Sequence, residues 1–97
     1  MSNWQNYKPR EGLSLQEVEG ELVILDQTNR KIHQLNPAAT VVWRTVAEQS
    51  AVDSELALAA LLDHFDVEQA AAAADLDILL QQFVDLKLLV DDSSRGD

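Results

Sequence analysis

The side chains that most often perform catalysis or hold metals are sparse in this 97-residue chain. Cysteine is absent, which removes disulfides, thiol nucleophiles and thiolate metal sites together. The two histidines, His33 and His64, have no cysteine beside them and do not show the spacing of a metal-ligand pair. The three glycines are isolated from one another, so the sequence contains no glycine-rich phosphate-binding loop.

Carboxylates are abundant, but their placement does not indicate an acid–base site. Asp91 and Asp92 stand in a polar C-terminal segment, where nothing would perturb their acidity. Asp75 and Asp77 are two residues apart on an expected helix, so their side chains point in different directions. The sequence therefore predicts a protein that is not an enzyme and that binds no cofactor or metal.

The net charge of −10 is unevenly distributed along the chain. Residues 51–97 hold eleven acids and two bases, whereas residues 1–50 hold six acids and five bases. Nucleic-acid affinity depends on lysine and arginine neutralising phosphates, so the second half would repel DNA or RNA. The simplest interpretation of this half is a solvated acidic surface that aids solubility.

The chain shows no signal for export or membrane insertion. Residues 1–10 are polar and lack the apolar core of a signal peptide. No apolar run approaches the roughly 20 residues that a membrane span needs. We therefore expect a cytoplasmic protein with no membrane partner.

The first half of the chain shows the pattern of three short strands. Aliphatic residues alternate or run together over residues 13–18, 22–25 and 31–35, with turn residues between these segments. Asn29, in the second turn, can adopt a left-handed conformation at little cost. The short connections favour an antiparallel meander.

Helical spacing begins after the third strand. Asn36 can cap a helix whose first position is Pro37, and that helix is expected to end near Ser50. A second helix can be capped by Asp53 or Ser54.

A third helix is expected after Asp66, which forms a capping-box pattern with Gln69. Apolar residues recur at intervals of three and four up to Leu86, and residues 88–90 add a short extended segment. Strands followed by helices predict an α+β domain in which the helices cover one face of the sheet. The expected core consists of Leu35, Val42, Trp43, Val46, Leu61, Phe65, Leu79 and Phe83.

Two features of this arrangement could bind a partner. The third strand would be an edge whose outer N–H and C=O groups can pair with another strand, although Arg30, Lys31 and His33 could equally guard that edge. Five alanines at residues 70–74 could form a shallow trough on the third helix, or could simply favour helix formation. If the trough faces the strand edge, the two form a groove for an extended peptide.

The segment from Glu21 to Trp43, ELVILDQTNRKIHQLNPAATVVW, resembles the PqqD family, the peptide chaperones of pyrroloquinoline quinone biosynthesis. That family shows an aliphatic strand ending in Asp, a turn, a strand ending in Leu-Asn, and a helix with a tryptophan. The similarity extends more weakly over residues 9–12 and continues to residue 90. Asn29 stands where relatives often have glycine.

The resemblance implies a winged-helix-like domain of three antiparallel strands followed by three helices. It assigns residues 13–90 to this domain, residues 1–12 to an N-terminal tail and residues 91–97 to a disordered polar tail. Family members bind a leader peptide as an added strand between the third strand and third helix. They present it to a modifying enzyme, often a radical S-adenosylmethionine enzyme. Carried onto this chain, the peptide contacts are Lys31, Ile32, His33, Gln34, Ala72, Asp75, Leu76 and Leu79.

Three alternatives stay open beside this hypothesis. PqqD-like proteins also occur in other clusters, such as cell-surface polysaccharide synthesis, where the chain would be a non-catalytic interaction subunit. A winged helix can bind DNA, but the acidic second half disfavours that function. The exposed strand edge could also pair two copies into a homodimer.

Overall fold

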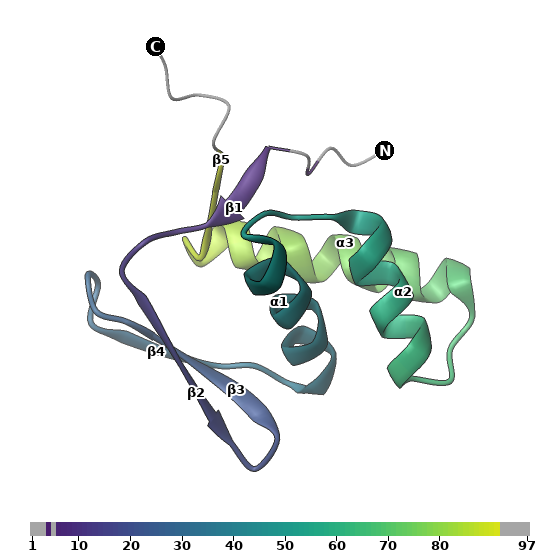
Figure 1. Ribbon diagram of the computed structural model, residues 1–97, viewed down its shortest axis with the longest axis horizontal. Coiled ribbons are helices and arrows are strands. Elements are labelled where there is room, and N and C mark those ends of the chain that lie inside the picture. The colour runs from purple at the N-terminus through teal and green to yellow at the C-terminus, as the bar shows by residue number, and fades with distance from the viewer. Residues whose placement is uncertain (1–3, 5, 92–97) are drawn as a thin grey trace.

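The computed structural model describes residue 4 and residues 6–91, and its elements form an α+β domain (Figure 1). In chain order they are β1 (Tyr7–Pro9), β2 (Leu13–Val18), β3 (Glu21–Asp26), β4 (Lys31–Gln34), α1 (Pro37–Gln49), α2 (Ser54–His64), α3 (Gln69–Asp85) and β5 (Leu89–Asp91). The prediction of a three-stranded antiparallel sheet followed by three helices is confirmed.

The three-stranded sheet has the order β2-β3-β4, so β4 lies at one edge. Alternation along β3 buries Leu22, Ile24 and Asp26, because these side chains face the helices. The opposite face of the sheet is more open, and Ile32 on β4 is 72% exposed there. Ile32 lies opposite Leu25 in the β3–β4 register.

Helix α1 lies at the centre of the molecule and contacts β1, β3, α2 and α3 (Figure 1). Its Trp43 is 1% exposed, and the indole meets the Phe83 ring of α3 edge to face at 5.1 Å between centroids. Seven of the eight residues predicted for the core are buried. The exception, Phe65, is half-buried and packs against the rim of that core.

Two of the three predicted helix caps are confirmed. The Asn36 side chain accepts a hydrogen bond from the Ala39 N–H at 2.8 Å, and Asp53 accepts from two N–H groups of α2. The capping box at Asp66 is wrong: Glu68 occupies the cap position of α3 and makes no side-chain cap bond. The helix begins at Gln69, so Asp66 lies two residues outside the cap and cannot reach the orphan N–H groups.

The segment expected to be an N-terminal tail contains β1, which pairs antiparallel with β5. The Tyr7 carbonyl accepts from the Val52 N–H at 2.9 Å, and the Arg10 N–H donates to the Leu88 carbonyl at 3.0 Å. These bonds tie the start of the chain to its end and to the α1–α2 connection. In the expected C-terminal tail, Asp91 belongs to β5, and residues 92–97 lie outside the described residues.

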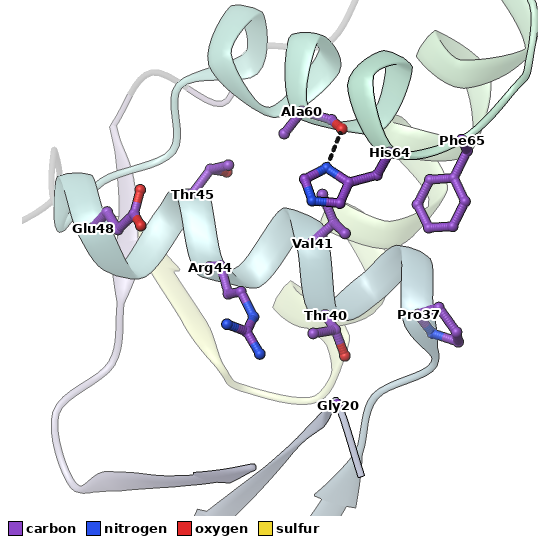
Figure 2. Close-up of a pocket in the computed structure, with 10 residues that line it drawn as sticks. All are labelled: Gly20, Pro37, Thr40, Val41, Arg44, Thr45, Glu48, Ala60, His64 and Phe65. Atoms are coloured by element: carbon purple, nitrogen blue, oxygen red, sulfur yellow. Dashed lines mark hydrogen bonds between the residues drawn. The ribbon is translucent and has the colours of Figure 1, made fainter. Parts of the chain in front are cut away.

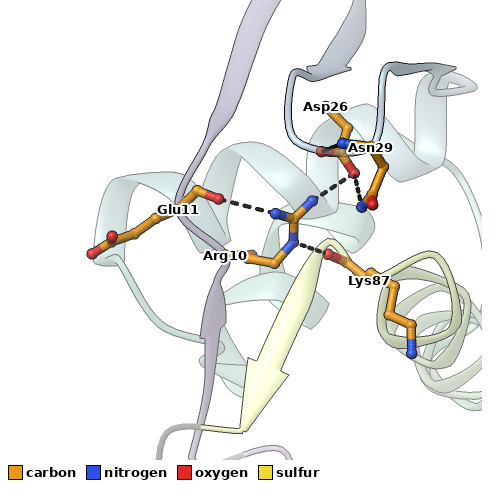
Figure 3. A network of polar contacts seen from close by, with 5 residues as sticks. All are labelled: Arg10, Glu11, Asp26, Asn29 and Lys87. Atoms are coloured by element: carbon orange, nitrogen blue, oxygen red, sulfur yellow. Dashed lines mark hydrogen bonds and ion pairs between the residues drawn. The ribbon is translucent and has the colours of Figure 1, made fainter.

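A partly buried ion pair joins three turns at the side of the domain where β4 begins (Figure 3). The Arg10 guanidinium pairs with the Asp26 carboxylate, and Arg10 Nε donates to the Lys87 carbonyl at 2.6 Å. Asp26 also accepts hydrogen bonds from the backbone and side-chain amides of Asn29. The left-handed residue of this turn is Arg30, with φ 58°, and not Asn29 as expected, because Asn29 is held by Asp26.

We predict that Asp26→Asn lowers the midpoint of thermal unfolding at pH 7 by about 10 °C or more, since it leaves Arg10 without its buried partner. The hydrogen bonds from Arg10 and Asn29 hold the pKa of Asp26 well below its usual range near 4. As pH falls, the unfolded chain therefore takes up the proton first. The stability that Asp26 contributes is complete above about pH 5 and is lost progressively below it.

Unfolding of both proteins followed at pH 7 and at pH 3.5 checks this expectation. The wild-type midpoint should fall more steeply with acidification than that of Asp26→Asn. Glu17→Gln is the control, because Glu17 pairs with Arg44 in an exposed salt bridge and should matter little. Equal acid sensitivity of wild type and Asp26→Asn would contradict the role given to the ion pair.

Candidate functional site

Among the described residues, no strand pairs with the outer edge of β4. The Leu35 N–H donates to the Leu22 carbonyl at 2.9 Å, which marks these two residues as a hydrogen-bonded pair. Hydrogen-bonded pairs alternate along an antiparallel ladder, so His33 turns its N–H and C=O toward β3. Ile32 and Gln34 consequently direct their N–H and C=O groups away from the sheet. These two residues are the pairing points for an added strand.

A hollow of about 320 Å³ runs beside this edge, between β4 and the last turns of α3. Residues 32–34 form one wall, and Gln82, Phe83 and Leu86 form the other. Ala39 of α1 contributes to the lining between them. Leu86 is 43% exposed, so the helix wall presents an apolar side chain to the hollow. We call this feature the β4–α3 groove.

The groove continues past the start of β4 into a second hollow, because His33 and Leu86 line both. Arg10, Lys31 and Lys87 line this second hollow. His33 is half-buried, and its Nε2 atom is buried with no hydrogen-bond partner among the described residues.

The structure places the four strand residues predicted for the site along the two hollows beside β4. Ile32, His33 and Gln34 line the β4–α3 groove, and Lys31 lines its continuation. Lys31, Ile32 and Gln34 are exposed, so their outer surfaces are accessible to a partner.

The four predicted helix residues lie elsewhere on α3. Leu76 and Leu79 are buried in the core, at 4% and 7% exposure. Ala72 and Asp75 line a different, apolar hollow toward α2, which Phe65 also lines. The structure therefore does not bring these four side chains to the groove beside β4.

The alanine run does not form the expected trough against the strand. Ala72 is 2% exposed and belongs to the core, and Ala70, Ala71, Ala73 and Ala74 face solvent. None of the five lines the groove beside β4. The helix wall instead comes from Gln82 and Phe83 of α3 and from its C-cap residue Leu86, more than two turns beyond the alanine run. The amphipathic stripe that ends at Leu86 was the sequence signal for this wall.

A larger hollow of about 610 Å³ lies between α1, α2 and the β2–β3 turn (Figure 2). The Nδ1 of His64 donates to the Ala60 carbonyl at 2.9 Å, and Arg44 pairs with Glu17 at 2.9 Å. The hydroxyls of Thr40 and Thr45, which also line this hollow, donate to the Leu35 and Val42 carbonyls and not to His64. Across the described part of the chain, no three His, Asp or Glu side chains gather as a metal site would require. In the same part, no helix has both the length and the apolar character to cross a membrane.

Two solved structures share the fold of this chain. TbiB1, solved in complex with the TbiA(beta) leader peptide, has a TM-score of 0.77 and 18% identity, over 93% of this chain and 99% of TbiB1. A lasso peptide synthetase B1, complexed with the leader peptide, has a TM-score of 0.76 and 18% identity, over 88% of this chain and 98% of the other. No curated protein sequence matches the chain.

A comparison with protein-family models matches a region that includes the motif from Glu21 to Trp43. The family model described as Coenzyme PQQ synthesis protein D (PqqD) matches residues 21–89, which include β3, β4 and all three helices. The winged-helix-like architecture shared with the solved structures is consistent with that match. The chain belongs to the PqqD family.

Proposed function

We propose that this chain binds the leader of a ribosomally synthesised precursor peptide as an added strand on β4. The observation that carries the proposal is the pair of outward-facing backbone positions, Ile32 and Gln34, beside the β4–α3 groove. Main-chain hydrogen bonds to an open edge give affinity, and side chains in an adjoining groove give specificity. Both similar structures were solved with a leader peptide, which supports the same class of ligand.

The geometry defines how such a peptide would lie. Alternate side chains of the added strand would point into the groove, where Phe83, Leu86 and Ala39 can pack against them. A leader that continues past the end of β4 would approach the apolar hollow lined by Ala72 and Asp75. In this arrangement Leu76 and Leu79 support the helix from the core and do not touch the peptide.

The proposed role is presentation and not chemistry. Binding fixes the leader in an extended conformation, so a modifying enzyme meets an ordered substrate at a higher effective concentration. A radical S-adenosylmethionine enzyme is one such partner. The chain itself contributes the β4 edge and the β4–α3 groove.

The function is tested with the precursor peptides encoded beside the gene. A synthetic leader from one of them should bind the purified chain in calorimetry with 1:1 stoichiometry. Adding the chain should accelerate modification of the full precursor by the enzyme of the same cluster. If no leader binds a folded sample, the chain acts instead as an interaction subunit whose partner is a protein.

We predict that Leu86→Ala weakens leader binding by about tenfold, because the peptide loses an apolar contact worth roughly 1–1.5 kcal/mol. Stability should change little, since Leu86 is already 43% exposed. Ile78→Ala is the matched control: Ile78 is on the same helix and 57% exposed, but it does not line the groove. Equal affinities of the two variants would place the peptide away from this wall.

A further inference from the structure

Positive charge gathers at one end of the groove of an otherwise acidic protein. The described residues include six lysines and arginines, and three of these, Arg10, Lys31 and Lys87, line the hollow that continues the groove. A fourth, Arg30, lies next to Lys31 in the turn before β4. The exposed acids of α2 and α3 are distributed over other surfaces, with the exception of Asp85.

The acidic side chains at this end of the groove are too few to neutralise its basic side chains. Arg10 is neutralised by Asp26, and the Glu11 carboxylate points away from the Arg10 guanidinium (Figure 3). Asp85 lines the same hollow and accepts a hydrogen bond from Gln81 at 3.0 Å. It can offset one lysine only. Within the described residues neither Lys31 nor Lys87 forms a salt bridge, so this end of the groove keeps an excess of positive charge.

A buried polar atom beside this charge also lacks a partner. The Nε2 atom of His33 is buried without a hydrogen bond, and His33 lines both the groove and its cationic continuation. Lys31 and His33 are two residues apart on β4, so their side chains lie on the same face of the sheet. A carboxylate placed beside Lys31 would meet an ammonium group that forms no salt bridge among the described residues, and a turn of the His33 ring would be needed to bring its buried Nε2 atom to the same ligand.

The part of the groove beside the end of β4 is lined by uncharged side chains. Beside the end of β4, the lining includes Leu35, Ala39 and Phe83, which are buried and apolar. The groove is therefore polarised along the strand: it is cationic near Lys31 and uncharged near Leu35, where Asn36 and Gln82 add neutral polar groups to the apolar lining. A bound strand would need matching side chains at the corresponding positions.

We infer that the chain selects leaders that carry an acidic side chain at the cationic end and a large apolar side chain beside Leu35. This inference rests on the proposed strand addition. Inward-facing positions of an added strand recur every two residues, and Lys31 is four residues from Leu35. The acidic and apolar side chains of the leader are then two or four residues apart, whichever way the strand runs.

A displayed library of random twelve-residue peptides tests the inference with the full chain as bait. Peptides selected by the wild type should be enriched in Asp or Glu two or four residues from an aromatic or aliphatic residue. Synthetic versions should bind K31Q/K87Q about fivefold more weakly and K31E/K87E more than tenfold more weakly. The K31E/K87E variant should itself select Lys or Arg at the acidic position.

The matched control is R44E. It reverses one positive charge, as each substitution in K31E/K87E does, but Arg44 lies at the hollow between α1 and α2. Its affinity for the selected peptides should stay within twofold of the wild type. If selected peptides lack an acid and bind K31E/K87E normally, while Ile32→Pro still abolishes binding, charge selection is wrong and strand addition stands. If no peptide is selected, or those selected ignore Ile32→Pro, the proposed function fails and the inference with it.

Discussion

Replacing Ile32 with proline is expected to weaken leader binding by at least about 100-fold, because the edge loses one of its two outward N–H donors. The proline ring would also stand where the added strand must approach. The Ile32 N–H is not used by β3, and proline is tolerated on edge strands when its nitrogen faces outward. The variant should therefore stay folded, with the helical circular dichroism of the wild type.

Ile32→Ala separates the backbone from the side chain. It keeps the N–H and removes a side chain that is 72% exposed on the opposite face of the sheet. Calorimetric titration with the leader should give an affinity within a few-fold of the wild type for Ile32→Ala and no measurable heat for Ile32→Pro. Unchanged affinity in a folded Ile32→Pro sample would contradict the proposal that the leader binds as an added strand.

Trp43→Ala is expected to cost about 3–5 kcal/mol of unfolding free energy, which is a large part of the roughly 5–15 kcal/mol that small domains possess. Trp43 is 1% exposed and packs edge to face against Phe83, which connects α1 to the helix wall of the groove. Its indole N–H has no hydrogen-bond acceptor among the described residues, so the contribution comes from packing.

Urea unfolding of Trp43→Ala, Trp43→Phe and a surface control measures this contribution. Trp43→Phe should recover most of the lost stability, since it refills much of the cavity without the N–H. Leu15→Ala is the control, because Leu15 on β2 is 45% exposed. A Trp43→Phe variant as unstable as Trp43→Ala would show that the indole nitrogen, and not packing, is what the core requires.

Sequence patterns that span only a few residues, such as helix caps and strand-to-helix changes in spacing, predicted the starts of α1 and α2 correctly. The change from strand to helix spacing at Asn36-Pro37 coincides with the start of α1, because Asn36 caps and Pro37 needs no N–H partner there. Asp53 caps α2 for the same reason. The order of the sheet followed from short connections, which make sequential strands neighbours.

Long-range contacts were not predictable from these local signals. The pairing of β1 with β5 joins residues 80 to 84 positions apart, and each strand has three residues. Pro9 within β1 also weakens any strand pattern. The role of Asp26 likewise depends on Arg10, which lies in a different turn.

The position of residues 31–34 on an edge strand was predictable, but the part of α3 that lies beside β4 was not. An edge strand is identified by its place in the order of the sheet, and Lys31 to Gln34 followed directly. Which part of α3 lies beside β4 depends on how the helix is placed against the sheet, and sequence periodicity does not contain that information. The apolar stripe identified Leu79 and Leu86 as one face, but only packing shows that Leu79 is buried and Leu86 opens to the groove.

The central claim is that a leader peptide adds to β4 beside α3. The most direct test is an NMR titration of the labelled chain with the leader encoded beside its gene. If the leader adds to β4, the amide signals of Ile32 and Gln34 shift most and become protected from exchange, and the signals of Gln82 and Leu86 shift with them. Shifts confined to the hollow around Arg44 and His64, with Ile32 and Gln34 still exchanging freely, would contradict it.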